Sequence, residues 1–229
     1  MKSQPRALYV LDIVTPLLVF IAILVVIFYA PVEAYMGRVQ KIFYFHLAAA
    51  WVGMLGFGVA VVAGVAYLVT RQRKWDIAGY AAVEVSLVFF LIAIVAGSIW
   101  ARRTWGTWWT WDPRLTSAAI VELVYAAYLM LRQGIEDPDR RARFGAVYAI
   151  VAFISVPITF LSIRILRTIH PDLTQGGGSG GMGLTPKMVQ TMLFSLFVFS
   201  FVFVDLFWHR LRLGQLVDKI EQLRLKITE

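Results

Sequence analysis

The sequence predicts an all-α integral membrane protein with six transmembrane helices and a short amphipathic helix after the last of them. Hydrophobic residues make up 59% of the 229 residues, while charged residues make up only 16%, well below the ~25% typical of soluble domains. Six apolar stretches have lengths close to the ~20 residues that a helix needs to cross the hydrocarbon core of a membrane. Lysine and arginine concentrate in alternate segments between these stretches.

Each stretch is expected to form one membrane span. The first is too long for a signal peptide and lacks a small-residue cleavage site, so we expect it to remain as the first helix. The fifth contains Pro157, which has no backbone donor and is expected to kink its helix. The six spans, which together define one domain over residues 1–208, cover residues 8–30, 46–70, 78–100, 116–132, 145–163 and 189–208.

The charge distribution predicts the orientation of the chain. An even number of spans places both termini on one side, and most of the 22 lysines and arginines fall on that side. The positive-inside rule therefore predicts that both termini are cytoplasmic (N-in, C-in). The net charge of +8 then reflects topology, and no nucleic-acid partner is expected.

The last 21 residues, 209–229, form a separate region of mixed character. Leu213, Val217 and Ile220 recur at helical spacing with charged residues between them, which predicts a cytoplasmic amphipathic helix. Such a helix either lies on the membrane lipid surface or docks a partner, and the sequence leaves both alternatives open.

A tryptophan-rich loop between the third and fourth spans is the most distinctive motif. Four of the eight tryptophans fall between Trp105 and Trp111, whereas an interfacial belt spreads tryptophans around a protein. Flat aromatic rings suit a large planar apolar ligand. The loop ends in Asp112-Pro113, a typical helix start, so Asp112 has a structural role whether or not it contacts a ligand. The candidate ligand-binding residues of the loop are Trp105, Gly106, Thr107, Trp108, Trp109, Trp111 and Asp112.

Two of the three histidines fall on the same predicted side as this loop. His46 and His170 lie at the ends of spans in different segments. Because haem iron commonly takes histidine nitrogen as an axial ligand, the two could approach one iron from opposite faces. His209 follows the sixth span on the other side, and we expect it to be an ordinary interfacial residue.

Other charged residues have two possible roles. Three arginines near the loop either anchor it at the membrane interface or pair with haem propionates, which match guanidinium forks; these are Arg102, Arg103 and Arg114. Acidic residues inside membrane helices are costly and point to function. We expect those of this chain to make helix contacts or to meet partner subunits, and they are Glu84, Glu122 and Asp205.

The run from Trp105 to Ser117 resembles the tryptophan-rich WWD signature that three families of haem-handling membrane proteins share. The length and the six spans favour the cytochrome c maturation protein C family, also called haem exporter protein C, because the other two families are considerably longer. The segment from Lys41 to His46 is similar to the first histidine segment of that family, and Thr168–His170 is similar to the second. The resemblance covers most of the chain.

The resemblance implies a haem carrier and not an enzyme. Such proteins hold haem b transiently and non-covalently at the outer, periplasmic face of the bacterial cytoplasmic (inner) membrane, with His46 and His170 as the implied iron ligands. They pass haem to a membrane-anchored haem chaperone, and they work with the ATP-binding, membrane and small subunits of the cytochrome c maturation complex. Any ATP hydrolysis would belong to another subunit, because this chain has no phosphate-loop motif.

Two other classes of function compete with haem transfer. An electron-transfer subunit of the cytochrome b type would place paired histidines deep within its helices, whereas His46 and His170 lie at predicted membrane edges. A non-haem permease or structural subunit would use the tryptophans only as membrane anchors. Replacing Trp108, Trp109 and Trp111 together separates these cases, because only a haem carrier would lose haem while still inserting into the membrane.

Overall fold

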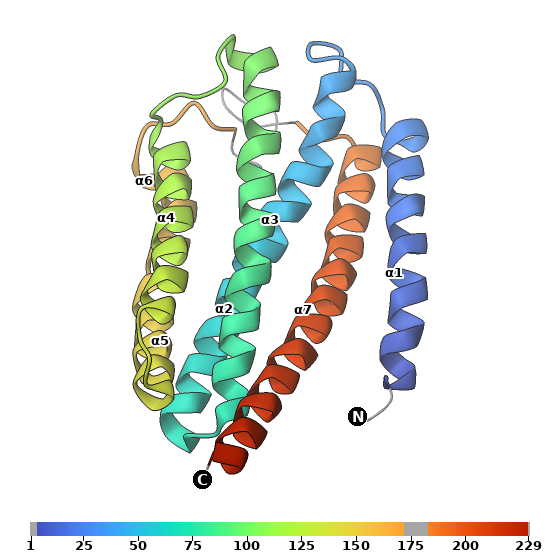
Figure 1. The fold of residues 1–229 in the computed structure, drawn as a ribbon. Helices are drawn as coiled ribbons and strands as arrows, with labels where there is room; N and C mark the ends of the chain where they lie inside the picture. The colour runs from blue at the N-terminus through green and yellow to red at the C-terminus, as the bar shows by residue number, and fades with distance from the viewer. Residues whose placement is uncertain (1–3, 172–182, 229) are drawn as a thin grey trace.

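The computed structural model describes residues 4–171 and 183–228 and shows an elongated bundle of helices (Figure 1). Within these described residues, six helical segments are long and apolar enough to cross a membrane, which confirms the predicted all-α membrane fold. The helices, in chain order, are α1 (Arg6–Leu24), α2 (Ile42–Thr70), α3 (Arg73–Trp105), α4 (Pro113–Gln133), α5 (Pro138–Ala152), α6 (Ser155–Ile165) and α7 (Pro186–Thr228).

The first span and its connection to the second contain two short irregular helices. A single π-helical turn, Val25–Tyr29, extends α1, and a 3₁₀ turn, Arg38–Lys41, leads into α2. The side chain of Lys41 donates to the carbonyl of Ile27 at 2.5 Å, so the end of the first span is tied to the start of the second.

The fifth span is broken where a kink was predicted. Helix α5 ends at Ala152 and α6 begins at Ser155. Pro157 lies in the first turn of α6, and it has no N–H for the carbonyl of Phe153, four residues earlier. The backbone compensates with a tighter bond from the amide of Val156 to the carbonyl of Phe153, at 3.0 Å.

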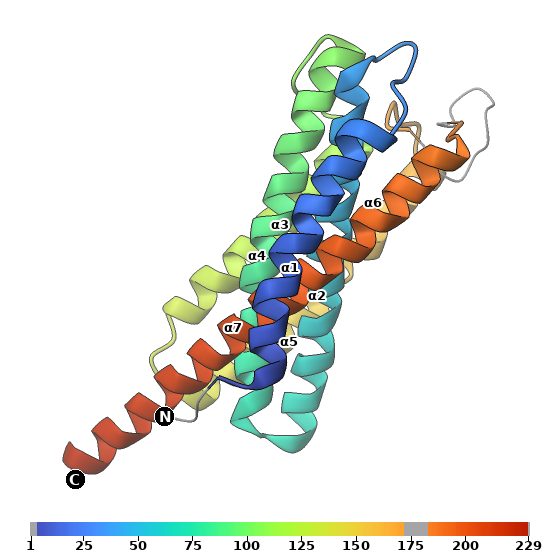
Figure 2. The same ribbon diagram turned by 90° about the vertical axis from the view of Figure 1, so that its right-hand side faces the viewer.

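Both chain ends lie at the same end of the bundle (Figure 1), which we call the terminal end; the opposite end is the site end. Helix α7 runs without interruption from Pro186 to Thr228 and extends obliquely past the other helices at the terminal end (Figure 2). The amphipathic helix expected after residue 208 is therefore continuous with the sixth span. Its separate role stays a prediction.

One core cluster joins α2, α3 and α4 to α5 and the start of α6, and another joins α2 and α3 to α7. Phe57 and Tyr125 are fully buried and stack face to face, with ring centroids 3.7 Å apart. At the terminal end, Arg132 of α4 donates to both carboxylate oxygens of Asp76 of α3, at 2.5 and 3.1 Å. Apolar packing and this buried ion pair hold α3 and α4 together, so the loop that joins them at the site end has fixed anchors.

Candidate functional site

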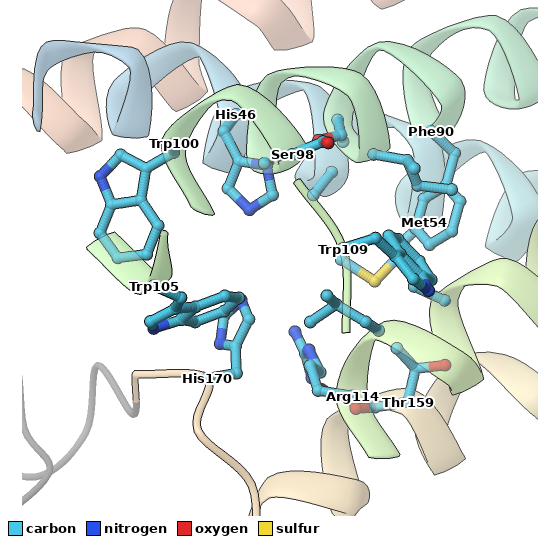
Figure 3. A pocket seen from close by; sticks show the side chains of 16 residues that line it. His46, Met54, Phe90, Ser98, Trp100, Trp105, Trp109, Arg114, Thr159 and His170 are labelled. Atoms are coloured by element: carbon cyan, nitrogen blue, oxygen red, sulfur yellow. Dashed lines mark hydrogen bonds between the residues drawn. The ribbon is translucent and has the colours of Figure 1, made fainter. Parts of the chain in front are cut away.

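A cavity that holds about 700 Å³ of empty space, its opening to solvent included, lies at the site end between α2, α3, α4, α6 and the segment that follows α6 (Figure 3). The cavity brings together five of the residues singled out in the sequence, and they are His46, Trp105, Trp109, Arg114 and His170.

His46 enters the cavity from the first turns of α2. Its Nδ1 lies 2.8 Å from the carbonyl oxygen of Ala93 on α3. A carbonyl only accepts hydrogen bonds, so Nδ1 carries the proton, and the lone pair of the neutral ring is on Nε2. This is the arrangement that orients a metal-binding histidine.

Gly97 makes room for the His46 ring. A Cβ at position 97 would lie only 2.8 Å from Cε1 and 3.0 Å from Nδ1 of that imidazole. Because α3 has no side chain at this position, the ring can rest against the helix and reach the Ala93 carbonyl. No pattern in the sequence indicates this role for Gly97.

His170 comes from the segment after α6. Its Nδ1 lies 3.1 Å from the carbonyl oxygen of Pro171, so its lone pair is also on Nε2. Burial, the positive charge of Arg114 and the proximity of His46 together lower the pKa of His170 to about 4, and burial is the largest of these causes. His170 is therefore neutral at pH 7, which is the form that can bind a metal.

The two imidazoles lie on opposite sides of the cavity (Figure 3). One is carried by α2 and the other by the chain after α6, so the fold joins residues that are far apart in sequence. Two neutral histidines that face a shared space can act as axial ligands on the two faces of one haem iron.

The four tryptophans of the loop form two pairs with different surroundings. Helix α3 ends at Trp105, and Gly106 follows with a φ of 73°, a left-handed conformation that favours glycine. Trp105 and Trp109 line the cavity, whereas Trp108 and Trp111 are 57% and 78% exposed and are not among the lining residues.

Hydrogen bonds fix the course of this loop. The hydroxyl of Ser98, on α3, donates to the carbonyl of Trp108 at 2.6 Å. The hydroxyl of Thr107 donates to the carbonyl of Trp109 at 3.1 Å. Trp109 and Trp111 also meet edge to face, with ring centroids 5.8 Å apart. The loop is therefore held against α3, with Trp109 facing inward.

Asp112 connects the tryptophan loop to the second histidine. Its carboxylate caps α4 by accepting from the amide of Arg114 at 2.9 Å, as predicted for a helix start. It also accepts from the hydroxyl of Thr168 at 2.6 Å and the amide of Ile169 at 2.8 Å. The Thr168 hydroxyl in turn accepts from the amide of His170 at 3.1 Å. This buried carboxylate thus positions the backbone that carries His170.

The three arginines near the loop differ in their surroundings. Arg114 is half-buried and lines the cavity. It donates to the carbonyl of Thr159 on α6 and lies over the ring of Phe160 at 5.0 Å. Arg102 and Arg103 are exposed outside the cavity, and Arg102 donates to the carbonyl of Gly106.

Several residues that line the cavity carry no signal in the sequence. Trp100 is buried on α3 and meets Trp105 edge to face, with ring centroids 6.1 Å apart. The other unpredicted lining residues are mostly small or apolar, and they are Ala50, Met54, Phe90, Ala93, Ile94, Gly97, Ser98, Leu115, Ala118 and Thr159.

The intramembrane acids lie outside this cavity. Glu84 of α3 pairs with Arg210 of α7 at 2.6 Å, which is a contact between helices, whereas Asp205 lies 3.5 Å from His209 one turn along the same helix. Glu122 forms no ion pair with any residue that the structure describes. None of the three is placed to bind a ligand between the two histidines.

Comparison with known protein families gives a match over residues 1–226 to the family described as Heme exporter protein C. A Heme exporter protein C from Bradyrhizobium diazoefficiens is 33% identical over 196 residues, which cover 86% of this chain and 74% of the relative. One from Escherichia coli is 28% identical over 201 residues, which cover 88% and 80%. One from Rhodobacter capsulatus is 38% identical over 124 residues, about half of each chain.

Proposed function

This chain belongs to the heme exporter protein C family, and on that premise we propose that it binds haem b in the cavity at the site end and passes it to a haem chaperone. The observation that carries the proposal is the pair of imidazoles on opposite sides of the cavity (Figure 3). Both rings donate from Nδ1 to a carbonyl, so the nitrogen with the lone pair is Nε2 in each. His46 and His170 are the proposed axial ligands of the haem iron.

The chemistry of the cavity suits the rest of the haem molecule. Trp105, Trp109 and Phe90 offer flat apolar surfaces for the porphyrin, which is the part that water solvates worst. Arg114 supplies a guanidinium for one propionate. Arg102 and Arg103 are proposed to approach the propionates from outside the cavity. The chain contains no cysteine, so haem is held without a thioether bond.

The arrangement also supports reversible binding. His170 does not lie inside a membrane helix. It lies on the segment after α6, which Asp112 holds through two hydrogen bonds. A hydrogen-bonded segment can be displaced at lower cost than a packed helix. We propose that the chaperone receives haem as the His170 segment moves away. Trp108 and Trp111, which are exposed, are the proposed aromatic contacts with membrane lipid or with the departing haem.

The wider setting of the site is part of the same proposal. With both termini cytoplasmic, as the charge distribution favours, the site end faces the periplasm of a bacterial inner membrane. The proposed partners are the ATP-binding, membrane and small subunits of the cytochrome c maturation complex. Energy from ATP would enter through the ATP-binding subunit.

The direct test is the haem content of purified single variants. We expect His46→Ala and His170→Ala to lose most of the co-purified haem and to shift the Soret band, because each removes one iron ligand. His209→Ala is the matched control, since it removes a histidine at the other end of the bundle. Wild-type haem content and an unchanged Soret band in both site variants would exclude these ligands.

A second set of variants tests the division of the loop. We expect Trp105→Ala and Trp109→Ala to lower haem content, and Trp108→Ala and Trp111→Ala to retain it while slowing transfer to the chaperone. If the variants insert into the membrane but none of the four changes haem binding or transfer, the tryptophans are membrane anchors only.

A further inference from the structure

Two carboxylates and an imidazole meet between α1 and α7, toward the terminal end and away from the haem cavity. His209 Nε2 lies 2.7 Å from Oδ1 of Asp12 and 3.5 Å from Oδ1 of Asp205. One ligand atom from each of the three residues lies within 4.8 Å of the other two. The sequence separates Asp12 from the other two residues by nearly the whole chain, so only the fold reveals this cluster.

The charges of the cluster do not balance. Asp12 and Asp205 carry two negative charges when ionised, and His209 supplies at most one positive charge. Throughout residues 4–171 and 183–228, no lysine or arginine forms an ion pair with either carboxylate. Two neighbouring carboxylates on apolar helices repel each other strongly. The cluster therefore requires a further cation or proton.

A buried hydroxyl beside these carboxylates is a second, independent observation that points to a bound ligand. Thr15 lies one turn after Asp12 on α1, is only 5% exposed, and stands beside the Asp205 carboxylate. Its hydroxyl makes no hydrogen bond of acceptable geometry with the described residues, and neither does the buried Oδ1 of Asp205. Unpaired buried polar atoms are costly, and in native proteins a bound ion or water commonly satisfies them.

We propose that Asp12, Asp205 and His209 bind one divalent cation of the Zn²⁺ class. Imidazole nitrogen and carboxylate oxygen are both donors that zinc accepts, and bonds of about 2.0–2.1 Å place tetrahedral ligands about 3.3 Å apart. The two measured separations of 2.7 and 3.5 Å bracket that spacing. The hydroxyl of Thr15, which stands beside Asp205, would hydrogen-bond a metal-bound water.

Such an ion would act as a clamp between the first and last spans. Helix α1 stands at one edge of the bundle, beside α7 (Figure 1). Its buried residues, Leu8, Thr15 and Ala22, form a single narrow stripe. A cation held by side chains of both helices would neutralise the two acids and fix α1 on α7.

Metal titration of the full-length protein in detergent tests the proposal. After chelation and dialysis, Zn²⁺ is titrated by calorimetry, and Co²⁺ is titrated as a spectroscopic probe whose visible absorption reports tetrahedral ligands. We expect one equivalent to bind the wild type, and at least a tenfold loss of affinity in Asp12→Asn and in His209→Gln. Asp218→Asn, which removes an α7 carboxylate paired with Arg73, is the control and should bind as the wild type does.

Circular dichroism and haem content of each variant separate a lost site from a lost fold. If Asp12→Asn does not fold, His209→Gln decides the outcome. The His209 side chain is about half exposed, so replacing it leaves the packing of the core unchanged. A wild type that takes up no stoichiometric metal, or variants that bind it unchanged, would overturn the proposal. The cluster would then be a proton-sharing triad.

Discussion

Gly97→Ala is the most informative single change, because it adds one methyl group beside a proposed iron ligand and removes no functional group. The new Cβ would lie 2.8 Å from Cε1 and 3.0 Å from Nδ1 of His46. Ordinary van der Waals contact begins near 3.4 Å, so the imidazole must retreat by roughly 0.6 Å from a close-packed position. That retreat strains the 2.8 Å hydrogen bond to the carbonyl of Ala93.

The expected cost follows from the lost hydrogen bond. A net hydrogen bond contributes about 1 kcal/mol, and a buried donor left unpaired costs about 1–3 kcal/mol. Since about 1.4 kcal/mol changes an equilibrium constant tenfold, we expect haem affinity to fall roughly 5- to 100-fold. Alanine favours a helix over glycine by about 1 kcal/mol, so α3 itself should not be weakened.

The assay is haem titration of the purified protein, followed by its Soret absorption. Gly58→Ala is the matched control, because it makes the same change inside α2, where the nearest side-chain atoms, those of Phe153, lie 3.9 Å away. We expect the control to bind haem as the wild type does. Equal haem affinity and identical spectra for Gly97→Ala and the wild type would refute the assigned position of His46.

Four further substitutions test other parts of the account. Asp112→Ala should lower haem occupancy several-fold and raise the rate of amide hydrogen exchange in residues 168–170, since it removes the two hydrogen bonds that hold this segment. An unchanged exchange rate there would contradict the role of Asp112 in positioning His170. Asp112→Asn should retain part of the binding, because an amide oxygen still caps α4. Arg132→Ala should lower the thermal midpoint of unfolding by several degrees, since breaking a buried ion pair costs about 3–5 kcal/mol. The haem affinity of the folded protein should not change, because Asp76, the partner of Arg132, lies at the terminal end. An unchanged midpoint would show that the pair adds no stability. Arg114→Gln should weaken the binding of haem more than that of a haem dimethyl ester, which lacks charged propionates, and equal losses would argue against a propionate contact.

Sequence periodicity and composition were sufficient to predict the spans. Apolar stretches of membrane length can hardly adopt another structure in lipid, and Pro157 marked the break between α5 and α6. The continuity of α7 through residue 208 was less evident. The charged residues that begin the tail change its polarity without interrupting the helix.

The candidate site was only partly predictable. His46, His170 and the tryptophan loop stand out because their residue types are rare or clustered. The inward position of Trp105 and Trp109 depends on the turn at Gly106 and on the bond from Ser98, which no local pattern specifies. Gly97 and Thr168 matter only through contacts with residues about 50 positions away. Such contacts become visible only when the helices are placed together.

The axial ligation of the haem iron tests the central claim most directly. Electron paramagnetic resonance and optical spectra of the ferric wild-type protein should show a low-spin, bis-histidine haem. His46→Ala and His170→Ala should each convert the haem that remains to a high-spin form, and added imidazole should restore the low-spin signal by entering the space that the side chain left. A wild-type low-spin spectrum in either variant without imidazole would contradict the assignment of that histidine as an iron ligand.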